Sequence, residues 1–202
     1  MTRRWRALAV LSLALLLTPT AAAAGTLTLR LDPGASTLGF VLDATLHKVE
    51  GHLGTASGAV AFDPVSGEAT GEVVIDLTAA QTGNERRDRK MHDKVLETDR
   101  HPVATYRVSR ISFRGPLQQG RNDVQLRGEL DLRGASHPIE VLATAQLEGD
   151  RVTATGFLDV PYVDWGLHDP SFFVLRVGKQ VRVELSIVGT VEGELPAANT
   201  AP

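Results

Sequence analysis

Apolar and polar residues alternate along most of this chain, and this alternation is the feature that most constrains its fold. In one segment Val124, Leu126, Leu130 and Leu132 share one parity, with polar residues between them, and residues 181–191 repeat the pattern. Side chains of a β-strand point alternately to opposite faces, so each such segment has one apolar face and one polar face. A chain made of many such strands must close a sandwich or a barrel around its apolar faces.

The first 24 residues have the features of a secretory signal peptide. Three arginines within the first six residues precede an apolar run at 7–17, and small residues follow at 21–24. A basic region, an apolar region and an A-x-A-like site define such a peptide. The apolar run is shorter than the roughly 20 residues of a transmembrane helix, so a retained membrane anchor is the less favoured alternative. We expect cleavage near Ala24, no membrane span in the mature protein, and a periplasmic or secreted location.

The composition excludes several classes of function. The chain has no cysteine, which excludes disulfides, thiolate metal sites and thiol catalysis. Its formal net charge of −3 becomes about −6 once the three N-terminal arginines are removed. An acidic chain without a basic tail is not expected to bind nucleic acid. The remaining residues, 25–202, suffice for one ordinary domain.

Alternating segments separated by turn residues predict the secondary structure. One charged helix is expected at 84–96. Strands are expected at 26–31, 36–46, 51–62, 68–77, 103–113, 124–133, 137–147, 151–160 and 180–193. The prediction is therefore an all-β fold, an antiparallel barrel of about eight strands with one inserted α-helix. We expect it to occupy residues 25–195, followed by a flexible tail at 196–202.

Small residues on the expected inner faces leave two interpretations of the barrel interior. They are Gly128, Ala143, Ala145, Ala154 and Gly156. An eight-stranded barrel is just wide enough for filling side chains or one slender ligand. Small residues would either leave an apolar cavity or simply let the sheet curve. The pattern alone does not separate these two possibilities.

Three segments resemble the YceI-like family of exported lipid-binding proteins. Residues 82–106 read TGNERRDRKMHDKVLETDRHPVATY, residues 128–141 read GELDLRGASHPIEV, and residues 160–181 form the third segment. The resemblance spans the whole mature chain and implies a lipocalin-like barrel with an elongated tunnel. It implies a tunnel that holds an isoprenoid quinone or polyprenyl chain, for carriage, storage or stress protection. His101 departs from the family, because many members have an aromatic residue before this proline.

The expected ligand-binding residues form an apolar lining rather than a catalytic motif. Aromatic side chains of the excursion at 161–178 would either grip a lipid or close one end of the core. No catalytic residue, metal ligand or cofactor is expected besides a bound isoprenoid-type lipid. The expected lining consists of Phe40, Leu42, Val73, Ile75, Tyr106, Val108, Leu126, Leu130, Val141, Phe157, Trp165, Phe172, Phe173, Val183 and Leu185.

Polar residues of the expected helix offer an alternative enzymatic function. Asp88 and His92 are four residues apart and would share a helical face, with Asp93 next to them and His101 further on. A metal-dependent hydrolase could use such a cluster, but no H-E-x-x-H motif is present. The alternating charges of the segment are more typical of a solvated, ion-paired helix face.

Three further possibilities concern the barrel as a whole. The first is an interaction or stress-response module with a filled interior and no ligand. The second, an outer-membrane barrel, would need aromatic girdles, whereas aromatic residues make up only 5% of this chain. The third is that the barrel pairs with a second copy as a homodimer.

Overall fold

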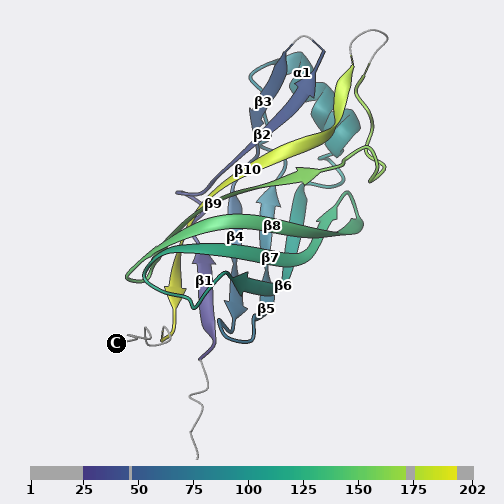
Figure 1. Ribbon diagram of the computed structural model, residues 1–202. Coiled ribbons are helices and arrows are strands. Elements are labelled where there is room, and N and C mark those ends of the chain that lie inside the picture. The colour runs from purple at the N-terminus through teal and green to yellow at the C-terminus, as the bar shows by residue number, and fades with distance from the viewer. Residues whose placement is uncertain (1–24, 46, 172–175, 195–202) are drawn as a thin grey trace, which may run out of the picture.

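The computed structural model describes residues 25–45, 47–171 and 176–194. The expected signal peptide, the tail at 196–202, and Phe172 and Phe173 lie outside these residues. The described chain forms one antiparallel sheet and one helical segment (Figure 1). The strands are β1 (Leu27–Leu31), β2 (Thr37–Ala44), β3 (Lys48–His52), β4 (Ala56–Phe62), β5 (Glu68–Asp76), β6 (Val103–Phe113), β7 (Gly120–Leu132), β8 (Ala135–Glu148), β9 (Arg151–Val160) and β10 (Val177–Glu192).

Eight of these strands close into a barrel. They pair in the order β1-β4-β5-β6-β7-β8-β9-β10, and β10 returns to β1 through pairs such as Thr28 with Glu192. Closure leaves no free sheet edge around the ring. The predicted all-β antiparallel barrel with one inserted helix is therefore confirmed.

The strands β2 and β3 prolong the barrel wall at one end. The long strand β10 pairs with β2 from Val177 to Ser186 and with β1 from Gly189 to Glu192. Since β3 pairs with β2 and β4 pairs with β1, the two extra strands continue the wall beyond the closed ring.

The sequence predicted one strand at 51–62, and this prediction is wrong. The chain instead leaves β3 at His52 and enters β4 at Ala56. Between them the Leu53 amide donates to Leu38 on β2, whereas the Gly54 amide donates to Asp76 on β5, both at 2.9 Å. The backbone changes its hydrogen-bonding partner here, so the ladder is interrupted.

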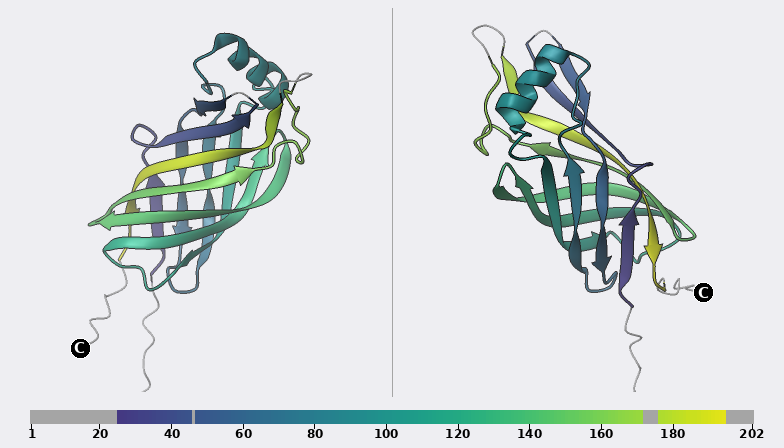
Figure 2. Two further views of the ribbon diagram at one scale, coloured as in Figure 1. Left: turned by 45° about the horizontal axis from the view of Figure 1, so that its top comes forward. Right: turned by 180° about the vertical axis from the view of Figure 1, so that it is seen from behind.

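The expected helix at 84–96 is present and consists of two parts. The α-helix α1 (Glu85–Lys90) begins at Asn84, whose side chain caps it by accepting from the Arg87 amide at 3.1 Å. It continues as the π-helix η1 (Met91–Leu96), which ends where Glu97 takes a left-handed conformation. In both views of Figure 2 the helix lies across one end of the barrel. Among the described residues no helix is both long and apolar enough to cross a membrane.

The antiparallel order gives the barrel two distinct ends. The helix end carries α1, η1, the turn between β7 and β8 and the connection between β9 and β10 (Figure 2). The far end carries the turn at 63–67, the loop at 114–119 and the turn between β8 and β9, together with the start of β1 and the end of β10 (Figure 1).

Candidate functional site

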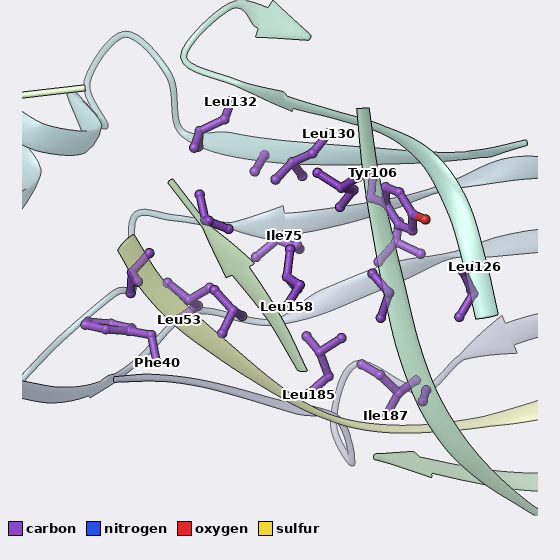
Figure 3. A pocket seen from close by; sticks show the side chains of 18 of the residues that line it. Phe40, Leu53, Ile75, Tyr106, Leu126, Leu130, Leu132, Leu158, Leu185 and Ile187 are labelled. Carbon is purple, nitrogen blue, oxygen red and sulfur yellow. The ribbon is translucent and has the colours of Figure 1, made fainter. Parts of the chain in front are cut away.

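The interior of the barrel contains an elongated apolar cavity of about 640 Å³. Its lining runs from helix residues such as Met91 at one end to Leu117 in the loop at the other. Figure 3 shows leucine and isoleucine side chains from several strands pointing into this space. The volume falls in the range of about 300–1,000 Å³ that is usual for small-molecule sites. A barrel with a filled interior is therefore not what this chain forms.

The twofold period of the strands builds this lining. On β10, Val181, Val183, Leu185 and Ile187 all border the cavity, while the intervening Arg182 does not. One parity likewise lines the cavity on β7, β8 and β9. On β6 the parity changes at a register shift between Val108 and Arg110, so Val108 and Ile111 both border the cavity. The alternation seen in the sequence thus determines which side chains surround the cavity.

The small inward residues serve both purposes that the sequence left open. Ala143, Ala145 and Ala154 line the cavity and leave its volume unfilled. The two glycines instead allow close approach of the backbone. A Cβ at Gly128 would lie 2.0 Å from the Arg107 carbonyl oxygen, and one at Gly156 would lie 2.6 Å from that of Leu142.

Eleven of the fifteen expected residues line the cavity. Two of the others, Phe172 and Phe173, lie outside the described residues. Neither Phe157 nor Trp165 lines the cavity. The eleven that line it are Phe40, Leu42, Val73, Ile75, Tyr106, Val108, Leu126, Leu130, Val141, Val183 and Leu185.

The expectation that Phe157 faces the interior is wrong. Phe157 is 48% exposed, and the Arg182 guanidinium lies 4.7 Å from the centre of its ring. Its neighbour Leu158 borders the cavity, and successive side chains of a strand face opposite sides. The parity of β9 therefore directs Phe157 outward, where it pairs with the exposed Leu142 on β8.

Trp165 closes the core beside the cavity instead of lining it. Its ring stacks on His137 with centres 4.0 Å apart and planes 2° from parallel. Trp165 also packs against the buried residues of the hydrophobic core. Of the two roles weighed for this side chain from the sequence, the structure supports closing the core.

Several cavity residues were missing from the expected set. Leu158 and Ile187 follow the parity of their strands, so the pattern could have identified them. Leu117 lies in a loop and Met91 on the helix, where no strand period applies. The other leucines of the lining that were not expected are Leu29, Leu31, Leu53, Leu77, Leu96, Leu132, Leu147 and Leu167.

Polar side chains border the cavity mainly at the helix end. These are Thr82, Asn84, Arg86, Arg87 and Lys90. Arg87 donates from Nε to the Thr82 hydroxyl at 2.7 Å and from Nη2 to the Thr82 carbonyl at 3.0 Å. The Lys90 ammonium donates to the Pro170 carbonyl at 2.8 Å, which joins the helix to the connection between β9 and β10.

The three cations at this end form a positive mouth, which we define as Arg86, Arg87 and Lys90. Within the described part of the chain, no carboxylate lies within 4 Å of their nitrogens. By contrast, Arg89 on the same helix pairs with Glu85 at 3.7 Å and does not border the cavity. Negative charge on a ligand would therefore be favoured at the helix end.

The helix histidine is engaged in structural hydrogen bonds. His92 Nε2 lies 2.8 Å from the Ala80 carbonyl, and Nδ1 lies 3.1 Å from the Thr98 hydroxyl. Because a carbonyl only accepts, Nε2 donates to Ala80, and both ring nitrogens are therefore occupied by hydrogen bonds. Asp88 accepts from both the amide and the hydroxyl of Thr82. Among the described residues no cluster of three metal-ligating side chains occurs. This arrangement does not favour the hydrolase that the sequence allowed.

Two tyrosines of the cavity wall have perturbed acidity. Burial, with a contribution from Glu140, raises the pKa of Tyr106 to about 12. Burial, with a contribution from Asp169, raises the pKa of Tyr162 to about 12. The Tyr162 hydroxyl donates to the Gly178 carbonyl at 2.7 Å. In the described part of the chain the buried Tyr106 hydroxyl has no hydrogen-bond partner.

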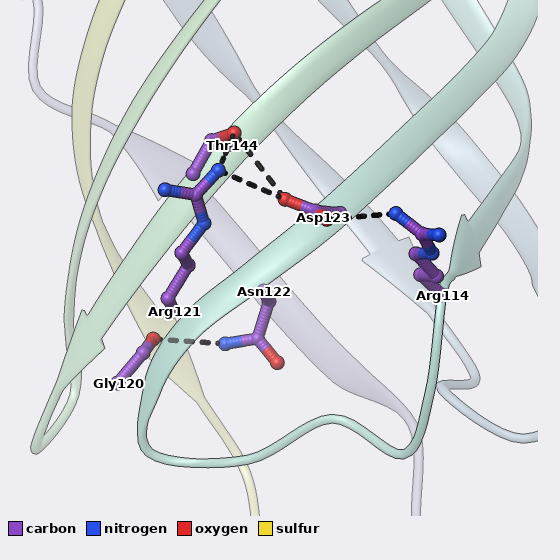
Figure 4. A network of polar contacts seen from close by, with 6 residues as sticks. All are labelled: Arg114, Gly120, Arg121, Asn122, Asp123 and Thr144. Atoms are coloured by element: carbon purple, nitrogen blue, oxygen red, sulfur yellow. Dashed lines mark hydrogen bonds and ion pairs between the residues drawn. The ribbon is translucent and has the colours of Figure 1, made fainter.

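A polar network lies at the far end, on strand β7 and the loop before it (Figure 4). Asp123 lies between two arginines, 3.9 Å from Arg114 and 3.5 Å from Arg121. Asn122 points the other way and is one of the cavity residues, 6% exposed. The far end is therefore charged on the outside, and Asn122 adds one polar side chain to the largely apolar cavity wall.

Comparisons with known proteins agree with this geometry. A family model described as the YceI-like domain matches residues 29–189. No curated protein matches the chain at a significant level.

Solved structures share the fold. A polyisoprenoid-binding domain from Saccharophagus degradans is 25% identical, with a TM-score of 0.64 over 81% of this chain and 98% of that one. BcnA of Burkholderia cenocepacia is 21% identical, with a TM-score of 0.65 over 79% of this chain and 99% of that one. The YceI protein of Campylobacter jejuni is 16% identical, with a TM-score of 0.57 over 74% and 88%. The latter two show the fold alone. Because the YceI-like domain model matches residues 29–189, most of the chain, this chain belongs to the YceI-like family.

Proposed function

We propose that this protein binds one long apolar lipid, an isoprenoid quinone or a polyprenyl chain, along the axis of the barrel. The observation that carries the proposal is the 640 Å³ cavity, whose wall is apolar along its length and polar mainly at its ends. The polyisoprenoid-binding domain of Saccharophagus degradans, which has the same fold, supports the class of ligand.

The lipid tail would enter from the helix end. Burial of apolar surface provides about 25 cal/mol per Å², or roughly 0.8 kcal/mol per methylene, so a few isoprene units supply ample gross free energy. Ordering of a flexible tail cancels part of this gain. The head group would remain at the positive mouth, where Arg86 and Lys90 are exposed to water.

We further propose that the protein is exported and carries, stores or protects its lipid outside the cytoplasm. The basic, apolar and small-residue pattern of residues 1–24 supports export. The test is cell fractionation followed by intact-mass measurement. A mature protein that begins near residue 25 in an extracytoplasmic fraction is expected, and an uncleaved cytoplasmic chain would contradict export.

Native mass spectrometry of the protein from its own host, followed by solvent extraction, tests the lipid-binding proposal. A discrete added mass that is released as an isoprenoid or quinone is expected. A ligand-free mass that also fails to shift with added prenyl quinones and prenyl alcohols would refute the proposal.

Two neighbouring residues of β9 provide a matched pair of variants. Leu158→Asp places a carboxylate in the cavity, where desolvation is costly, and is expected to abolish lipid binding. Phe157→Asp makes a comparable change one residue away on the outer face and is expected to bind as the parent does. Circular dichroism checks that both variants fold. Should Leu158→Asp not fold, Leu158→Trp fills the same space and is expected to reduce binding. Equal binding by the parent and a folded Leu158 variant would contradict the assigned cavity.

A further inference from the structure

The loop between β6 and β7 closes the far end of the cavity with a single side chain. This loop comprises residues 114–119, all of which the structure describes. Of the loop residues, Leu117 alone borders the cavity. The Leu117 side chain packs against the buried residues of the hydrophobic core. Its neighbours Pro116 and Gln118 are exposed. Leu117 therefore points inward from a loop that otherwise faces water.

A buried amide holds Leu117 in this position. Asn122 donates from Nδ2 to the Gln118 carbonyl at 2.8 Å and to the Gly120 carbonyl at 3.0 Å. Its Oδ1 accepts from the Gln118 amide at 3.1 Å. Asn122 thus binds both backbone groups of the residue that follows Leu117. Figure 4 shows its side chain directed toward Gly120.

A second pair of hydrogen bonds ties the same loop to the turn between β8 and β9. The Gln119 side-chain amide donates to the Gly149 carbonyl at 3.0 Å, and its oxygen accepts from the Gly149 amide at 2.9 Å. Because the loop is held from β7 and from this turn, it cannot swing away without breaking four hydrogen bonds. These hydrogen bonds fix the inward position of Leu117.

The loop separates the cavity from a second, polar hollow of about 260 Å³. Phe113 and Asn122 border both spaces. The polar hollow is formed otherwise by exposed residues of the loop and the start of β7, including Arg114 and Arg121. Removal of the Leu117 side chain would thin the partition between an apolar channel and this hollow.

We propose that Leu117 is the residue that sets the longest lipid tail the cavity accepts. This inference rests on the proposed lipid-binding function and deepens it. A tail that enters from the helix end advances along the apolar wall until its terminal isoprene unit meets Leu117. A longer chain would have to leave methylene groups in water at the mouth or displace a loop held by four hydrogen bonds. The residue determines chain length because it is the side chain that this rigid loop directs into the cavity.

A competition experiment tests this role. Delipidated parent and variants are mixed with an equimolar series of prenyl alcohols of increasing length, and bound species are counted by native mass spectrometry. Leu117→Trp is expected to shift the bound distribution to shorter chains. Its affinity for the longest chain that the parent accepts should fall about tenfold or more, the effect of a misfit of a methylene or two in an apolar pocket. Leu117→Ala is expected to shift the distribution to longer chains.

The matched control is Gln118→Trp, which adds the same bulk to the outer side of the same loop and should leave the distribution unchanged. Circular dichroism checks folding, and Leu117→Ala serves if the tryptophan variant does not fold. Folded Leu117 variants that bind with the parent's length distribution would overturn the proposal while leaving lipid binding intact. A parent that binds no member of the series would overturn lipid binding and this inference together.

Discussion

The rings of His137 and Trp165 lie face to face, with centres 4.0 Å apart and planes 2° from parallel. His137 belongs to β8, whereas Trp165 belongs to the connection that leads from β9 to β10. The same connection supplies Leu167 and Pro170 to the cavity. The stack therefore joins a cavity-bordering segment to the barrel wall at the helix end.

Trp165→Ala should lower the free energy of unfolding by about 1–3 kcal/mol, because the variant loses both the stack and apolar contact area. It should also release bound lipid faster, since the segment that carries Pro170 loses an anchor. Urea unfolding and the rate of lipid transfer to vesicles measure the two effects. Trp165→Phe retains an aromatic face and should recover most of the loss. An alanine variant as stable as the parent would contradict this role.

The strand period explains why much of the site could be predicted from the sequence. Leu130 and Val183 belong to alternating segments, and in a closed barrel one parity of a strand without a register shift must face inward. The prediction that Phe157 lines the cavity was wrong, because it conflicts with the inward parity of Ala154 and Leu158 on the same strand. The parity of Leu158 gives the correct orientation.

Features outside the strand period could not be predicted in this way. The interruption between β3 and β4 depends on a change of partner strand, which only the paired backbone reveals. The inward position of Leu117 depends on hydrogen bonds from Asn122, which follows it by five residues. The sequence did not indicate that Arg86 and Lys90 border the cavity, because both belong to a charged run that is typical of a solvated helix.

Gly128 is a position where the barrel tolerates a larger side chain poorly. A Cβ there would lie 2.0 Å from the Arg107 carbonyl oxygen and 2.9 Å from Cε2 of Tyr106. Gly128→Ala should therefore cost about 1–3 kcal/mol or more, because the backbone of β6 must move. Gly115→Ala is the control, since a Cβ added at Gly115 would have no atom within 4 Å in the described part of the chain. Thermal unfolding compares the two, and equal stability would contradict the close packing at Gly128.

The two buried tyrosines predict a loss of stability in alkaline solution. The pKa of each rises from 10.0 to about 12 on folding, chiefly through burial. Between these values the unfolded chain has released protons that the folded chain retains, so rising pH favours unfolding. The contribution of the two protonated tyrosines to the free energy of unfolding is fully present below pH 10 and is lost as the pH approaches 12.

Urea unfolding at a series of pH values tests this prediction. The free energy of unfolding should fall more steeply above pH 10 in the parent than in Tyr106→Phe. At neutral pH this variant should be as stable as the parent or up to about 1 kcal/mol more stable, because the hydroxyl that it removes is buried without a partner among the described residues. A parallel decline of both proteins above pH 10 would refute the contribution of Tyr106.

The positive mouth predicts a preference for lipids with an anionic head. Arg86 and Lys90 are exposed, so each should contribute no more than an exposed ion pair, about 0.2–1 kcal/mol. Arg86→Ala and Lys90→Ala should each weaken binding of a prenyl phosphate by up to about fivefold, while binding of the prenyl alcohol of equal length stays the same. The difference should shrink at high salt, because screening weakens interactions between exposed charges. Arg89→Ala removes a charge from the same helix away from the cavity and serves as the control. Equal losses for the phosphate and the alcohol in competition titrations would show that these cations act by shape and not by charge.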